Sequence, residues 1–145
     1  MDRLLDNARA GPLYLKQPAI AQLVFDAIAY GERELNRYQV HEFVVMANHV
    51  HLLITPLVPV PEITRTLKGI TSRQANRALG LTGTPFWEVE TYDHLVRSAG
   101  EFERIRHYIL QNPVRAGVVA APEQLPWSSG SATWTSRAGV DACRT

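Results

Sequence analysis

Two histidines, His49 and His51, stand two residues apart in an apolar run that extends from Phe43 to Ile54. Side chains alternate between the two faces of a β-strand, so both imidazoles are expected on one face while Val50 points to the other. Imidazole nitrogen is the commonest side-chain ligand of metal ions in proteins. The pair therefore predicts a metal-binding position, which needs further ligands from elsewhere in the chain.

A second group of reactive side chains lies between residues 101 and 112. The apolar spacing from Glu101 to Gln111 predicts a helix, on which Tyr108 and Asn112 are one turn apart and share a face. A tyrosine can act as a nucleophile, and an amide oxygen can act as a third metal ligand. From position alone, Tyr108 also fits a half-buried core residue, and Asn112 fits a residue that ends a helix.

Several stretches of the sequence carry a family resemblance. MANHVHLLITP, RTLKGITSRQANR, PFWEVETYDHLVRSAGEFERIRHYILQNPVRAGVV and WSS resemble the HUH single-tyrosine transposases of the insertion-sequence-200 type. Within that group they are most similar to the REP-associated tyrosine transposases. The resemblance runs from about Gly11 to Ser129, and it is specific because separated motifs occur in the family's order.

The resemblance implies an enzyme, a transposase that nicks single-stranded DNA and transfers the strand through a 5′-phosphotyrosine intermediate. Its implied substrates are hairpin-forming, REP-like sequences. It implies that Tyr108 is the catalytic nucleophile. It also implies that His49, His51 and Asn112 hold Mg²⁺ or Mn²⁺.

Two other functions stay open on the sequence. A catalytically inactive protein could bind hairpin DNA on the same scaffold. A metal-independent phosphoesterase of the histidine-triad type needs a further histidine two residues after His51, and Leu53 stands there. The second alternative is therefore disfavoured.

Basic and aromatic side chains around these motifs are candidates for DNA contact. Basic side chains can neutralise phosphates. The alternative is that these residues only form the solvent-exposed side of a helix, which is the more common situation. The candidates for phosphate contact are Arg65, Lys68, Arg73, Arg77, Arg97, Arg104, Arg106 and Arg115. Phe86, Trp87 and Tyr92 are candidates to stack on unpaired bases, with a core position as the alternative.

Composition places these motifs in one ordinary domain, residues 1–145. A chain of 145 residues with 46% hydrophobic residues can bury a single core. The net charge of +1 gives no overall nucleic-acid signature, and the lone Cys143 excludes an intramolecular disulfide. No stretch approaches the roughly 20 apolar residues that span a bilayer. We expect a cytoplasmic protein without a membrane partner, either a monomer or a homodimer.

The periodic segments predict an α+β fold. Helices are expected over residues 18–36, 62–79 and 101–111, the last stopped by Asn112-Pro113. Strands are expected over residues 38–46, 49–55 and 86–96. The resemblance sharpens this to a ferredoxin-like antiparallel sheet with helices on one face. Only about ten residues precede Gly11, so the first strand of the family is expected to be missing or truncated, and residues 128–145 to form a poorly ordered tail.

Overall fold

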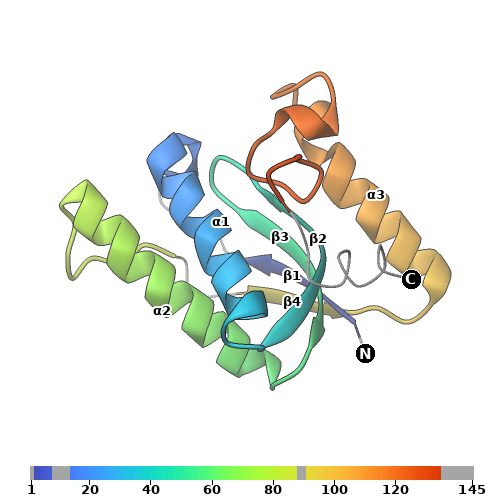
Figure 1. The fold of residues 1–145 in the computed structure, drawn as a ribbon, viewed down its shortest axis with the longest axis horizontal. Helices are drawn as coiled ribbons and strands as arrows, with labels where there is room; N and C mark the ends of the chain where they lie inside the picture. Colours follow the sequence, from blue (N-terminus) through green and yellow to red (C-terminus); the bar gives the residue numbers. More distant parts are fainter. Residues whose placement is uncertain (1, 8–13, 88–90, 135–145) are drawn as a thin grey trace.

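The computed structural model describes residues 2–7, 14–87 and 91–134 of the protein. Seven main elements follow one another along the chain (Figure 1). They are β1 (Arg3–Asn7), α1 (Pro18–Arg33), β2 (Tyr38–Val45), β3 (Val50–Pro56), α2 (Val60–Leu79), β4 (Thr91–Leu95) and α3 (Ala99–Arg115). Two short 3-10 turns, η1 (Tyr14–Lys16) and η2 (Pro122–Gln124), complete the set.

The strands form one antiparallel sheet with the order β2-β3-β1-β4. The first strand therefore lies inside the sheet, where Leu5 is opposite Leu52 of β3 and Asp93 of β4. The prediction that this strand is missing or truncated was wrong, because five residues are enough when both edges are paired. Leu4 and Leu5 face opposite sides of the sheet, and both sides are covered, so the segment lacks the polar alternation that would have marked it as a strand.

The sheet carries helices on both faces, not on one. Val50, Leu52 and Ile54 of β3 pack in the larger core beneath α1 and α2. Leu53 points the other way and joins a smaller core with Ile109 of α3. Figure 1 shows α3 on the side of the sheet away from α1 and α2. Leu52, Leu53 and Ile54 are consecutive apolar residues of β3 because both faces of the strand are covered. The prediction of helices on one face was wrong because α3 covers the second face.

Close contacts lock α1 onto β2. A Cβ at Gly31 would lie 2.2 Å from the Tyr38 hydroxyl oxygen, so only glycine lets the helix and the ring approach this closely. The same hydroxyl donates to the Ile28 carbonyl at 2.8 Å, and the buried Glu32 carboxylate accepts from the Val40 N–H at 2.5 Å. Burial raises the pKa of Tyr38 well above its usual range, so the phenol stays protonated and remains a donor.

The last helix, α3, is longer than predicted at both ends. It begins after Ser98, whose hydroxyl accepts from the Glu101 N–H at 3.1 Å, and it runs through Pro113 to Arg115. Asn112-Pro113 therefore does not stop it. Pro113 removes one backbone donor, but the ring is buried against the rest of the fold and its carbonyl accepts from the Val118 N–H at 2.9 Å. Tertiary packing thus outweighs the local preference.

Residues 128–134 belong to the folded domain. Ser128 forms a bridge with Val44 of β2, and the Ser129 N–H donates to the Phe43 carbonyl at 3.0 Å. Trp134 is buried, with its ring 4.6 Å from that of Phe43. The prediction of a poorly ordered tail does not hold for this part, and residues 135–145 lie outside the described residues.

Candidate active site

The histidine pair, His49 and His51, sits where β2 turns into β3. The strand begins at Val50, so His49 belongs to the turn, which is closed by a hydrogen bond from the Met46 N–H to the His49 carbonyl at 2.8 Å. The ring centroids of the pair are 4.8 Å apart. His49 Nδ1 is 2.9 Å from the Asn48 side-chain oxygen, which directs any metal coordination by His49 to Nε2. The predicted pairing of the two imidazoles is therefore present.

Tyr108 reaches the pair from α3. Its ring centroid lies 5.7 Å from that of His51, at an interplanar angle of 79°, and 43% of the residue is exposed. The Arg115 guanidinium carbon lies 4.2 Å from the centre of the same ring, and its Nη2 donates to the Tyr108 carbonyl at 3.0 Å. The phenol thus contacts an imidazole and a guanidinium while remaining open to solvent.

A buried carboxylate ties α3 to β2. Arg106 donates from Nε and Nη2 to Glu42 Oε1 at 3.1 and 3.0 Å, and the Ser129 hydroxyl donates to the other oxygen of Glu42. These bonds raise the pKa of Arg106 above its ordinary value, chiefly through the hydrogen bond to Glu42. Arg106, a sequence candidate for phosphate contact, is therefore paired with a buried carboxylate although its own side chain is partly exposed. Nothing in the sequence marked this pair, because its members are 64 residues apart.

The chemistry of the predicted ligands suits a divalent ion with open coordination positions. Asn112 lies on α3 one turn after Tyr108 and is half-buried. Within the described ranges, no third histidine, cysteine or acidic side chain joins the pair to make a three-ligand cluster. Two imidazoles therefore need oxygen ligands, such as an amide, water or a phosphate, and a mixed nitrogen and oxygen set fits Mn²⁺ or Mg²⁺.

The basic candidates divide between the two faces of the sheet. Arg65, Lys68, Arg73 and Arg77 lie on α2, on the face opposite the histidine pair. Arg97 precedes α3, whereas Arg104 and Arg115 are part of it. All are exposed except Lys68, which is half-buried. Only the three around α3 share a face with Tyr108.

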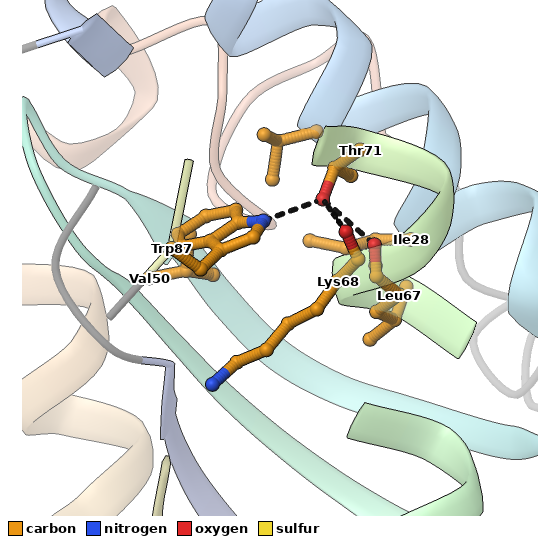
Figure 2. Close-up of a pocket in the computed structure, with 7 residues that line it drawn as sticks. Ile28, Val50, Leu67, Lys68, Thr71 and Trp87 are labelled. Atoms are coloured by element: carbon orange, nitrogen blue, oxygen red, sulfur yellow. Dashed lines mark hydrogen bonds between the residues drawn. The ribbon is translucent and has the colours of Figure 1, made fainter. Parts of the chain in front are cut away.

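Lys68 lines a small cavity between α2, α1 and the sheet. Figure 2 shows its side chain running beside Trp87 and Val50. Burial lowers the pKa of Lys68. The Trp87 N–H donates to the Thr71 hydroxyl at 2.7 Å, so this indole is part of the wall. The alkyl stem of Lys68 thus contributes to packing as well as carrying charge.

The aromatic candidates for base stacking are mostly used in packing. Phe86 is buried, with its ring stacked 5.8 Å from that of Tyr14 and 5.1 Å from that of Trp87. The side chain of Tyr92 lies outside the described residues. Phe86 and Trp87 are therefore better explained as packing residues than as residues that stack on bases.

A further polar pair lies near Tyr108 and was not among the predicted site residues. His94 Nε2 is 2.7 Å from Glu101 Oε1, and this hydrogen bond is the main reason the pKa of Glu101 is lowered. Glu101 already begins the predicted helix, and the capping-box spacing of Ser98 and Glu101 is the further signal that could have placed the helix start just after Ser98.

Comparison with known proteins gives one family and a set of similar folds. The family described as "Transposase IS200 like" matches residues 21–112. No curated protein sequence matches. A structure of a REP-associated tyrosine transposase bound to a REP hairpin is 21% identical, with 88% of this chain and 75% of that chain covered and a TM-score of 0.69. A transposase structure from Deinococcus radiodurans R1 is also 21% identical, with coverages of 75% and 88% and a TM-score of 0.51.

At this level of identity the two structures establish the fold, and they confirm the predicted α+β architecture. No helix in the described part of the chain is long and apolar enough to cross a membrane. The family match spans more than half of the chain and contains the histidine pair, Tyr108 and Asn112. The chain therefore belongs to the IS200-like transposase family and is a DNA-binding transposase.

Proposed function

We propose that the protein nicks single-stranded DNA beside REP-like hairpins and transfers the strand through a 5′-phosphotyrosine at Tyr108. The observation that carries this proposal is the contact between Tyr108 and His51, whose ring centroids are 5.7 Å apart. The two residues come from different elements and meet at a partly exposed position. An exposed phenol next to an imidazole pair is unusual for a residue that serves packing alone.

The reaction exchanges one phosphoester bond for another. The Tyr108 hydroxyl oxygen forms a bond to phosphorus, the bond between phosphorus and the 3′ oxygen breaks, and the 3′ oxygen takes up a proton as the phenol loses one. A phenol is a weak nucleophile at neutral pH, so its alignment and the nearby positive charge matter. The covalent link keeps the bond energy for rejoining, which suits strand transfer.

His49, His51 and Asn112 would hold the divalent ion. When bound, Mg²⁺ or Mn²⁺ offsets the negative charge that develops on the phosphate oxygens. The two imidazoles favour manganese on ligand softness. The contact of Tyr108 with His51 within one chain supports a monomer that carries a complete site.

The substrate class rests on the structural relative, which is bound to a REP hairpin. Arg97 and Arg104 share a face with Tyr108, and we assign them to phosphates near the cut. Arg65, Arg73 and Arg77 on α2 would contact DNA that wraps to the opposite face. A missing first strand would be one reason to favour an inactive hairpin-binding protein. The presence of β1 in the middle of the sheet removes that reason.

The test uses a labelled REP-type hairpin with single-stranded arms and Mn²⁺. We expect a covalent protein–DNA adduct on a denaturing gel, absent in Tyr108→Phe and unchanged in Tyr30→Phe, an exposed tyrosine of α1. Hairpin binding by Tyr108→Phe should stay close to that of the parent. Binding without any adduct would support the inactive alternative, and no hairpin binding would contradict both.

A further inference from the structure

A groove opens beside Tyr108 between α3 and the strands β1 and β4. Its volume is about 430 Å³, which lies in the range of sites that hold small ligands. The lining residues are Leu4, His94, Glu101, Arg104, Ile105 and Tyr108. Tyr108 is therefore both a neighbour of the histidine pair and part of the groove wall.

The other side of Tyr108 along the sheet is filled. Between α3 and β2 the side chains of Val44, Met46, Leu53 and Ile109 form a buried apolar core, and the Glu42–Arg106 pair lies on that side as well. A DNA strand whose phosphate reaches Tyr108 cannot continue through this core. Of the two directions across the sheet within the described part of the fold, the one toward β1 and β4 is open.

The lining of the groove has the chemistry of a nucleotide site. Ile105 and Leu4 are half-buried apolar side chains, suited to contact with the face of a base. Arg104 is exposed and presents a planar guanidinium, which suits a phosphate. Glu101 repels phosphate but can accept from a base amino group.

The Glu101 carboxylate has capacity for such a bond. Both hydrogen bonds that the described residues make with it fall on Oε1, one with His94 Nε2 at 2.7 Å and one from the Arg97 N–H at 3.3 Å. The hydrogen bond with His94 lowers the pKa of Glu101, so the group is ionised at neutral pH. An acid and an arginine in the same groove give a bound nucleotide one preferred orientation.

We propose that this groove binds one unpaired nucleotide of the cleaved strand, adjacent to the phosphate at Tyr108. Its phosphate lies at Arg104, its base lies against Ile105 and Leu4, and a base amino group donates to Glu101. The inference rests on the proposed function and adds a preference to it. Adenine, cytosine or guanine is accepted at this position better than thymine, which has no amino group.

The experiment measures binding to Tyr108→Phe, so that it does not depend on cleavage. A REP-type hairpin with single-stranded arms is first mapped for its cut, and each nucleotide beside the cut is then replaced by an abasic spacer. One replacement should weaken binding about tenfold. In Tyr108→Phe proteins that also carry Arg104→Gln or Glu101→Leu, the same replacement should cost less than about threefold. The preference over thymine should disappear with Glu101→Leu, which removes the acceptor that a glutamine would keep.

Two matched variants serve as controls. Lys16→Gln removes an exposed charge far along the chain from α3, and Glu103→Gln neutralises an exposed acid of α3 itself, so both should keep the full abasic penalty. The groove proposal is overturned if no abasic replacement weakens binding, or if the loss of affinity is unchanged in both groove variants. If the parent protein still forms the adduct in that case, the proposed function stands. Failure of the parent to bind the hairpin or form an adduct overturns the proposed function instead.

Discussion

The two faces of the sheet differ in how completely they are covered. Beneath α1 and α2 the face is closed by a continuous apolar core that includes Leu5, Phe43 and Leu52. Beneath α3 a smaller core covers only part of the face, and the rest carries His51 and an open groove. Adjacent residues of β3 thus serve opposite purposes. In a strand covered on both faces, the side chains on one face can stabilise the core while some of those on the other face serve a reaction.

The comparison also shows how few contacts set the position of the nucleophile. The larger core fixes the sheet, whereas α3 is held by the small core, by the Glu42–Arg106 pair and by the hydrogen bond between His94 and Glu101. Loss of one contact in the larger core should lower stability without a specific effect on cleavage. Loss of one contact under α3 should affect both.

The largest effect is expected at the histidine pair. His51→Ala or His49→Ala should lower single-turnover cleavage by about a hundredfold or more, because the ion they hold acts on the transition state. Hairpin affinity should change little. His107→Ala, an exposed imidazole on α3, is the matched control and should cleave normally. Equal losses in all three variants would mean that the effect is not specific to the open face.

An intermediate effect is expected where α3 is tied to β2. Arg106→Met leaves the buried Glu42 without its guanidinium and should cost about 2 kcal/mol of unfolding free energy, a moderate figure because the Arg106 side chain is 38% exposed. Cleavage should fall as Tyr108 shifts. Urea unfolding measures the change in stability, and single-turnover kinetics measure the change in cleavage rate.

The unfolding measurement on Arg106→Met has a control variant and a second-site variant that should restore stability. Glu103→Gln removes only the exposed partner of Arg106. Because the Glu103 side chain is 65% exposed, this change should lower the free energy of unfolding by less than about 0.5 kcal/mol. Adding Glu42→Gln to Arg106→Met should recover part of the loss, because the unpaired buried charge disappears. No recovery in the double variant would argue against an electrostatic tie.

The smallest effects separate Arg73 on α2 from Arg115 on α3. Arg73→Gln should lower the slope of log affinity against log salt by about 0.7–0.9 and leave cleavage at saturating DNA unchanged. Arg115→Gln should leave the slope unchanged and slow cleavage about two- to fivefold, because its guanidinium contacts the Tyr108 ring instead of a phosphate. Reversed outcomes would assign a phosphate contact to Arg115 and none to Arg73.

The parts of the site that follow a local period could be predicted from the sequence. The spacing of His49 and His51 placed both imidazoles together, and the helical spacing of Tyr108 and Asn112 placed them on one helix. The end of α2 at Gly80, where φ is +72°, also followed from residue type, since glycine adopts this conformation without strain.

The parts that depend on what covers an element could not be predicted in this way. Leu4 and Leu5 show no alternation because both of their faces are buried, so β1 was missed. Pro113 was expected to end α3 because the local rule takes no account of the packing around its ring. The Glu42–Arg106 tie joins distant segments, and neither residue type indicates its partner.

The position of β1 has a consequence for how the molecule is made. It precedes every other element in the chain, yet its partners are β3 and β4, and β4 follows α2. In a nascent chain one edge of β1 therefore stays unpaired until β4 has been made, and the sheet is completed only when distant segments meet, which slows folding. Until β4 emerges from the ribosome, that exposed edge is where this protein is most vulnerable to aggregation.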